Sequence, residues 1–372
     1  MDTSHAEIHF DSEGVCNYCH GYDVIARSLP SPEVASQLLK DAIMAVKAAG
    51  KGKPYDCVLG LSGGVDSSFL AVKLKEWGLR PLAVSFDNGW NTELAVQNIE
   101  KICRRLDVDL HTYVVDWPEF RDLQLSFVKA GLANVEAPSD HGIFACLYRT
   151  AMEKKIKYVA SGVNFATEAC NPVGDEAKRT FSYGYHYSDL YHLRAVHRRF
   201  GSRPLKTFPT MGFFTRLMIE RLGRVRRFEP LNLIPYSKSE AIALLQERYG
   251  WRPYEGKHGE SVITRFHQAY ILPVKFGMDK RKLHLSGLIW SGQISRADAL
   301  EELKRSPYPV NLIAQDKEFV AKKLGLSIAE FDALMNEVPH VYTDYPNRNW
   351  LYLALWRVLA LMARFRRLSR GK

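Results

Sequence analysis

The chain has 372 residues, of which 46% are hydrophobic and 25% charged, and this ordinary globular composition excludes long intrinsic disorder. Its net charge is +10, with basic residues gathered in two blocks, 194–227 and 357–372, that suit phosphate-bearing ligands. Neither a signal peptide nor an apolar stretch of the roughly 18 residues that span a bilayer is evident. We therefore expect a cytoplasmic protein with no transmembrane segment and with two or three structural units.

Strands and helices alternate in the first half of the chain. The apolar patterns predict a helix over 32–49, a strand over 56–62, a helix over 65–77, a strand over 81–86, a helix over 92–106, a strand over 109–115, helices over 118–130 and 141–155, and a strand over 158–161. Such alternation is typical of an α/β, Rossmann-like fold, in which helices cover both faces of a parallel sheet.

Beyond residue 189 the pattern becomes mainly helical. Helices are predicted over 189–200, 211–223, 238–249, 296–304, 316–324, 327–335 and 350–366. We expect three parts: a small N-terminal segment with two cysteines over 1–30, an α/β domain over 31–236 and a helical C-terminal domain over 237–372. The polar connection 165–188 is long enough to favour a functional role.

The most informative motif is Leu61-Ser-Gly-Gly-Val-Asp-Ser-Ser68, between a predicted strand and a helix. Gly63 and Gly64 allow an anion to approach the backbone closely, and the first amides of the helix favour negative charge there. Short hydroxyl donors come from Ser62, Ser67 and Ser68. No lysine follows, so the motif is not the phosphate loop of P-loop NTPases. Asp66 needs a cation or a helix amide beside it, and Mg²⁺ bridging phosphates is the natural candidate.

The Ser-Gly-Gly-x-Asp-Ser pattern resembles the signature of the PP-loop ATP pyrophosphatases. Such enzymes cleave ATP between the α and β phosphates and adenylylate an oxygen of their substrate, so the resemblance implies that the turn holds pyrophosphate. The ends of the second and fourth strands meet at the same edge of the sheet, where the resemblance implies an adenosine site; for Asp87 a plain Asx turn is an equal alternative. The implied nucleotide-binding residues are Leu61, Ser62, Gly63, Gly64, Asp66, Ser67, Ser68, Phe86, Asp87, Gly162 and Asn164.

Two flanking stretches narrow the resemblance. Residues 10–19, and 275–286 continuing into 291–300, resemble the N-acetyl sugar amidotransferases of lipopolysaccharide and O-antigen biosynthesis. The resemblance implies that ATP adenylylates the acetamido oxygen of a nucleotide-activated N-acetyl sugar, and that ammonia then displaces AMP and leaves an acetamidino group. Asp66, Lys280 and Arg281 are the implied catalytic residues. For Lys280 and Arg281, which would neutralise phosphate charge, a solvated basic helix face is the alternative.

Ammonia must come from another protein, because the sequence contains no recognisable glutaminase module. The resemblance implies separate partners: a glutaminase and a cyclase-like barrel, similar to the pair used in histidine biosynthesis.

Cys16-x-x-Cys19 supplies two of the four ligands of a tetrahedral zinc site. The family carries an earlier Cys-x-x-Cys pair that this sequence lacks. Either this sequence begins after that pair or this member has lost the site. His5, His9 and His20 are candidate substitute zinc ligands, with plain solvent-exposed histidines as the alternative.

Two other functions fit the same motif. A PP-loop tRNA-modifying enzyme, thiolating or lysidine-forming, agrees with the basic blocks and with Cys170, but no RNA-binding module is recognisable and nucleic acid is not favoured. A non-catalytic nucleotide-binding scaffold is the third reading. The apolar stretch 350–365 is expected to dock on the protein or a partner, with peripheral contact to a membrane surface as its alternative.

Overall fold

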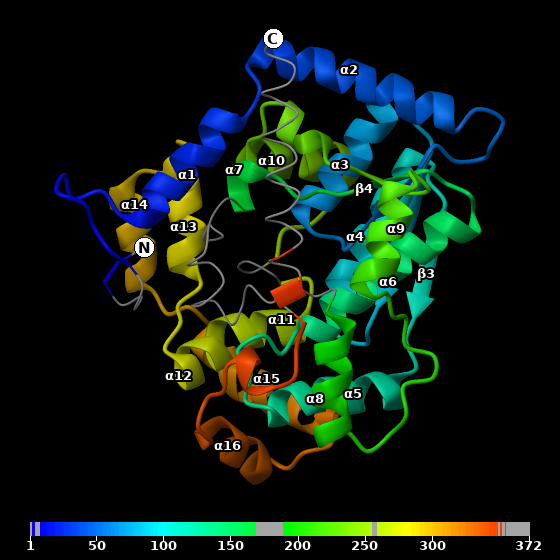
Figure 1. Cartoon of the computed structure of the whole chain (residues 1–372). Coiled ribbons are helices and arrows are strands. Elements are labelled where there is room, and N and C mark those ends of the chain that lie inside the picture. The colour runs from blue at the N-terminus through cyan, green and yellow to red at the C-terminus, as the bar shows by residue number, and fades with distance from the viewer. Residues whose placement is uncertain are drawn as a thin grey trace.

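The computed structural model describes residues 2–3, 8–168, 189–254, 259–348, 350–351 and 354 (Figure 1). Cys170, His5 and most of the predicted C-terminal helix 350–366 lie outside these described residues.

A five-stranded parallel sheet with the strand order β3-β2-β1-β4-β5 forms the centre of the α/β part. Its strands are β1 (Cys57–Gly60), β2 (Pro81–Asp87), β3 (Leu110–Val114), β4 (Tyr158–Ala160) and β5 (Arg226–Phe228). β1 pairs with β2 on one side and with β4 on the other, both in parallel register. The predicted parallel sheet is thus confirmed. The edge strand β5 was missed because its three residues, two of them exposed arginines, carry no apolar pattern.

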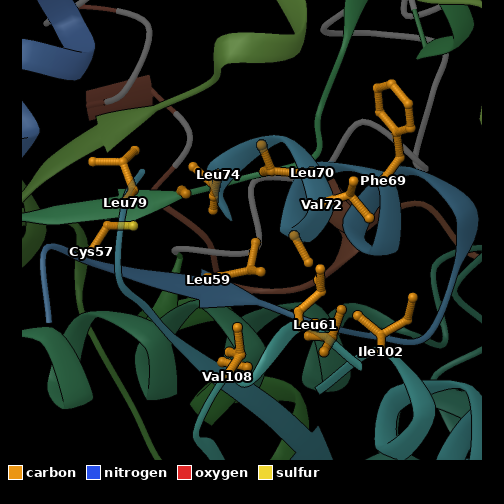
Figure 2. Close-up of a cluster of buried hydrophobic side chains, with 14 of the residues drawn as sticks. Cys57, Leu59, Leu61, Phe69, Leu70, Val72, Leu74, Leu79, Ile102 and Val108 are labelled. Carbon is orange, nitrogen blue, oxygen red and sulfur yellow. The ribbon is translucent and has the colours of Figure 1, made fainter. Parts of the chain in front are cut away.

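Helices cover both faces of the sheet, as predicted. α3 (Val65–Glu76), α4 (Glu93–Leu106) and α10 (Lys238–Tyr249) pack on one face, and α6 (Ala137–Glu153) and α9 (Phe213–Arg221) on the other. Figure 2 shows Cys57 and Leu59 in the same cluster as Leu70 and Leu74 of α3. Val58, between them in sequence, belongs to the cluster on the opposite face, because successive strand residues point to opposite sides.

The rest of the described chain is almost entirely helical. Its helices are α1 (Asn17–Ser28), α2 (Pro32–Ala49), α5 (Trp117–Lys129), α7 (Phe165–Glu168), α8 (Leu190–Phe200), α11 (Val262–Phe266), a π-helical turn (His267–Ile271), α12 (Leu272–Phe276), α13 (Arg281–Trp290), α14 (Arg296–Lys304), α15 (Val310–Leu324) and α16 (Ile328–Asn336), with 3₁₀ turns at Pro230–Leu233 and Tyr342–Asp344. α5, α8, α11, α15 and α16 bury their apolar faces in one common cluster. This confirms a mainly helical C-terminal part.

Helix capping explains where several of these helices begin. Ser237, Ser295 and Ser327 each accept a hydrogen bond at the side-chain oxygen from the backbone N–H three residues later. In α16 the reciprocal contact from Glu330 completes a capping box.

The predicted domain boundaries are crossed by packing contacts at two places. α10 and Trp251 share the core cluster of β1 and α3, so the α/β unit continues physically past the predicted boundary at residue 236. At the other end of the chain, Tyr22 of α1 stacks on Phe165 and contacts Trp290, with ring centroids 4.9 and 5.0 Å apart. None of the helices in the described part combines the length and hydropathy that a membrane span requires.

Substitution of a buried carboxylate next to β1 tests the packing around the start of the sheet. Asp56 is 3% exposed and accepts hydrogen bonds from the backbone N–H of Arg80 and from its guanidinium group. Replacing Asp56 by Ala leaves these donors without their acceptor, so we expect the free energy of unfolding to fall by about 2 kcal/mol. Glu100→Ala breaks an exposed ion pair with Arg104 and is the matched control, with a loss below about 0.5 kcal/mol. Urea denaturation measures both, and equal losses would contradict the assignment.

Candidate functional site

The glycine-rich turn is held in a conformation that only glycine adopts easily. Gly63 has a φ of +81°, in the left-handed region. Its carbonyl oxygen accepts hydrogen bonds from the Trp251 indole N–H and the Tyr254 hydroxyl, both at 2.9 Å. A Cβ atom at this position would lie 2.8 Å from the backbone oxygen of Ala95. The turn is therefore fixed both by its own backbone and by the segment that follows α10.

The start of α3 is open to an anion. Gly64 is the N-cap residue and provides no side chain to accept hydrogen bonds from the first amides of the helix. The Ser67 side-chain oxygen is 3.3 Å from the Ser62 backbone N–H and 3.2 Å from the Ser62 hydroxyl. Backbone amides, two hydroxyls and the positive end of the helix dipole thus lie together, an arrangement that favours phosphate.

Asp66 connects this turn to the end of β4. Its Oδ1 atom accepts hydrogen bonds from the Asn164 side-chain amide at 3.2 Å and from the Tyr236 hydroxyl. Asn164 is 1% exposed, and its carbonyl oxygen accepts from Thr167, so this residue positions Asp66 and lies away from solvent. Gly162 approaches so closely that a Cβ would lie 3.0 Å from the Asp66 carbonyl carbon. The Asp66 carboxylate suits a Mg²⁺ ion bound with the phosphates, since oxygen ligands are those Mg²⁺ prefers.

Two predicted nucleotide-binding side chains have other roles in this structure. Ser68 is fully buried, and its hydroxyl has no hydrogen-bond partner among the described residues. Asp87 accepts a hydrogen bond from the Gly89 backbone N–H at 2.8 Å, which is the Asx turn weighed as its alternative. Leu61, Ser62, Phe86 and Gly162, in contrast, line a cavity.

This cavity of about 470 Å³ lies at the carboxyl ends of β1, β2 and β4. Its walls come from three parts of the chain: the strand ends, the first turns of α6, and the segment 260–280. The lining residues are Gly60, Leu61, Ser62, Val84, Ser85, Phe86, Asn88, Asn91, Glu136, Ser139, Asp140, Ile143, Cys146, Leu147, Ala160, Ser161, Gly162, Glu260, Ser261, Thr264, Gln268 and Lys280. We call it the rim cavity. Its position is where open parallel sheets bind their ligands.

Glu136 at the start of α6 is held ionised by the C-terminal part of the chain. Burial by itself raises the pKa of this carboxyl group, but hydrogen bonding to His267 and Thr264 and the charges of His267 and Lys280 outweigh it and lower the pKa to about 2. His267 is fully buried, with Nδ1 3.0 Å from Glu136 Oε2 and Nε2 2.6 Å from the Ala133 carbonyl oxygen. Both ring nitrogens of His267 thus have hydrogen-bond partners on the segment 133–136.

Asp140 lies one helical turn further along α6 and has the opposite protonation behaviour. Its side chain lines the rim cavity and is exposed to solvent there. Removal from bulk water raises its pKa to about 7, the nearby charge of Glu136 adds to this, and Lys280 opposes it. These two carboxyl groups on one helix face thus titrate in different pH ranges, as in many acid–base sites.

Sequence reasoning missed Glu136, Asp140 and His267. The spacing of four residues between the two acids was a usable signal, since residues i and i+4 share a helix face. It was overlooked because the helix was expected to begin at residue 141. No local pattern could have found His267, whose partner is 131 residues away in the chain.

The structure separates Lys280 from Arg281. Lys280 lines the rim cavity and its charge acts on Glu136 and Asp140. The Arg281 guanidinium instead donates to the Asp279 carboxylate and to the carbonyl oxygens of Glu302 and Arg305. Arg281 thus joins α13 to α14, and it also lines a second, adjoining cavity together with Lys280.

A second cavity of about 1120 Å³ adjoins the first. Gln268 and Lys280 line both. The remaining wall comes mainly from α13, α14 and the stretch 305–312, with Tyr254 and Gly259 on the side of the turn. We call it the C-terminal cavity. Two adjoining cavities provide room for two substrates.

The N-terminal cysteines lie away from both cavities. The sulfur atoms of Cys16 and Cys19 are 3.4 Å apart, and His20 contacts Asp11 at 2.7 Å. Among the described residues, no group of three or more His, Cys, Asp or Glu side chains is arranged to hold a metal ion. Zinc binding by Cys16 and Cys19 stays a prediction.

The strand–turn–helix geometry, the motif and the rim cavity agree with the nucleotide site that the resemblance to PP-loop ATP pyrophosphatases implies. The comparison with protein families then links the chain to a particular process. Residues 260–361 match the family described as "LPS biosynthesis protein WbpG-like, C-terminal domain", which confirms the resemblance to lipopolysaccharide biosynthesis proteins. No curated protein matches the chain.

Several solved structures are similar to this chain. NMN synthetase from Francisella tularensis is 15% identical, with a TM-score of 0.37 over 73% of this chain and 96% of its own. NH3-dependent NAD synthetase from Campylobacter jejuni is 16% identical, with a TM-score of 0.33 over 82% and 98%. U34-tRNA thiolase NcsA from Methanococcus maripaludis is 17% identical, with a TM-score of 0.34 over 71% and 82%.

Two glycines with the same backbone conformation test the turn. Gly63→Ala adds a methyl group beside the Ala95 carbonyl oxygen, whereas at Gly52 (φ +76°) a Cβ meets nothing within 4 Å. Both changes incur the left-handed penalty of about 1 kcal/mol. We expect Gly63→Ala to lower the free energy of unfolding by about 3 kcal/mol in total, because backbone must also shift. Chemical denaturation of both variants measures the difference, and similar losses would refute the close packing of the turn.

The raised pKa of Asp140 gives a pH signature. The folded protein keeps this proton up to about pH 7, while the unfolded chain releases it near the ordinary value of 3.8. Between these two pH values the folded state binds more protons, so stability falls as pH rises. We expect Asp140→Asn to make the pH-dependent decrease in the free energy of unfolding smaller by about 1 kcal/mol. This value allows for screening of the carboxylate by water in the cavity. Thermal or urea unfolding from pH 4.5 to 8 measures it. Parallel curves for the two proteins would contradict the assignment.

Proposed function

We propose that the chain is an ATP-dependent amidotransferase acting on a nucleotide-activated N-acetyl sugar in lipopolysaccharide O-antigen or related glycan biosynthesis. One observation carries this proposal. The phosphate-binding turn opens onto a cavity whose opposite wall, with Thr264, Gln268 and Lys280, comes from the WbpG-like domain. Residues that bind the nucleotide and residues that recognise the sugar would then line the same cavity.

The rim cavity is suited to ATP. The triphosphate would lie against the turn and the first amides of α3, with Mg²⁺ at Asp66 neutralising its charge. Lys280, on the opposite wall, would approach the phosphates from the other side. The adenosine would lie along the strand ends, near Leu61, Phe86 and Gly162.

The reaction would run in two steps that balance. The acetamido oxygen attacks the α phosphate, a new O–P bond forms, and the bond to the β phosphate breaks, with pyrophosphate as the leaving group. Ammonia then adds to the imidate carbon, the C–O bond breaks, and AMP leaves, so that C=O becomes C=NH. Positioning and charge stabilisation are what the protein must supply.

The second step needs a group that accepts a proton from the attacking ammonia, and Asp140 fits this role. It faces the rim cavity, and its pKa of about 7 lies close to the working pH, where general base catalysis is most effective. Glu136, held ionised by His267, would keep a negative charge one turn away and thereby attract ammonium.

The sugar nucleotide is assigned to the C-terminal cavity. Its volume of about 1120 Å³ is ample for such a ligand, and Gln268 and Lys280 lie where it meets the rim cavity. Ammonia would be delivered by a separate glutaminase with its cyclase-like barrel. Glutamine would then support turnover only when these partners are present.

Product analysis tests the proposal. The chain is incubated with ATP, ammonium salt and UDP-N-acetyl sugars, and mass spectrometry looks for a sugar nucleotide about one dalton lighter, the consequence of replacing O by NH. We expect Lys280→Ala to lower kcat at least about tenfold through lost phosphate contacts. Lys282→Ala is the matched control, since Lys282 pairs with Asp2 outside the cavity.

Two outcomes would overturn it. No lighter product with any N-acetyl sugar nucleotide, together with sulfide- or lysine-dependent labelling of tRNA, would favour the tRNA-modifying alternative. Equal activity of the Lys280 and Lys282 variants would remove Lys280 from the site.

A further inference from the structure

An apolar stripe lies exposed on the outer face of α9. Phe214, Met218 and Leu222 are four residues apart, so they share one side of the helix. Their exposed fractions are 54%, 56% and 60%. Large apolar side chains grouped in this way on a single helix face indicate a contact surface.

The opposite face of α9 is firmly attached to the α/β part. Ile219 is buried in the cluster that contains Phe144 and Tyr148 of α6. Glu220 accepts hydrogen bonds from the Tyr148 hydroxyl and from Arg216, whose guanidinium also lies 4.6 Å from the Phe144 ring centroid. Figure 1 shows α9 beside α6. The stripe is therefore presented on a fixed element.

Exposed arginines lie near the stripe, either in space or directly after it in the sequence. Arg194 and Arg198 of α8 share a hollow with Phe213 and Phe214, and further exposed arginines follow α9. The members of this basic ring are Arg194, Arg198, Arg221, Arg224 and Arg226. None of them forms an ion pair with another residue in the part of the chain that the structure describes, while Glu220 and Glu229, the acids of this stretch, are paired with Arg216 and Arg227.

We propose that this face of α9 binds the surface of a membrane rich in anionic phospholipid. Phe214, Met218 and Leu222 would enter the boundary between headgroups and acyl chains, and the arginine ring would lie among the phosphates. Apolar insertion and attraction of basic residues to anionic lipid are the two components of interfacial binding. The sequence feature behind it is the basic block 194–227, which the ATP site leaves unused.

Charge and size favour a lipid surface over a protein partner. Arginines that have no acidic partner among the described residues match a surface that is uniformly negative. One face of a nine-residue helix is small compared with the roughly 800 Å² that a stable protein interface covers on each partner. Because α6 runs from α9 back to Glu136 and Asp140, membrane binding would fix the orientation of the rim cavity.

Co-sedimentation of the full chain with vesicles tests the proposal. We expect binding to phosphatidylcholine vesicles that contain phosphatidylglycerol, no binding to phosphatidylcholine alone, and a loss of binding as salt rises. Phe214→Ser combined with Met218→Ser should weaken binding at least about tenfold. The matched control is Val34→Ser with Leu38→Ser, an equally exposed apolar pair on α2 that has no ring of arginines.

Further variants decide between the possible results. Arg221→Gln with Arg224→Gln should reduce the salt dependence, and this surface variant serves if the apolar variant does not fold. Unchanged binding of the Phe214/Met218 variant, or no binding of the full chain to anionic vesicles, would overturn the proposal. So would loss of binding confined to Trp356→Ser with Leu359→Ser, because the C-terminal segment would then be the membrane contact.

Discussion

The carbonyl oxygen of Gly63 is the point on which the site depends. This oxygen accepts two hydrogen bonds, one from the Trp251 indole N–H and one from the Tyr254 hydroxyl. These residues lie 188 and 191 positions later in the sequence. The phosphate-binding turn is thus held by side chains from the segment between α10 and the C-terminal domain. Without those contacts the glycine-rich loop would sample other conformations. Its backbone amides would then no longer be aligned to bind an anion.

The same dependence appears on the other side of the rim cavity. Glu136 belongs to the α/β part, but its charge state is set by His267 and Thr264 of the WbpG-like domain. Lys280 of that domain also acts on Asp140. The C-terminal part of the chain therefore lowers the pKa of both carboxyl groups. This gives the C-terminal domain a chemical role in addition to its contribution to the C-terminal cavity.

Sequence reasoning reached the sheet, most helices and the glycine-rich turn between β1 and α3, because local apolar periodicity and the Ser-Gly-Gly-x-Asp-Ser motif encode them directly. It did not identify Glu136 and His267, because these residues become part of the site only through a contact between positions 131 residues apart in the sequence. It also missed α11 to α13, because the helical stretch Val262–Phe276 contains a π-helical turn that breaks the 3.6-residue period and ends at Gly277. Arg281 was expected in the site because it lies in a stretch that resembles the family, and the sequence did not show its contacts with Asp279 and the Arg305 carbonyl oxygen.

Oxygen labelling tests the central claim most directly. The account requires that the oxygen of the acetamido group attacks the α phosphate of an ATP bound at residues 62–68. With ¹⁸O in that acetamido group, the account predicts that the label leaves in the phosphate of AMP while pyrophosphate remains unlabelled. Label found in orthophosphate, accompanied by ADP, or retained in the sugar product would contradict it.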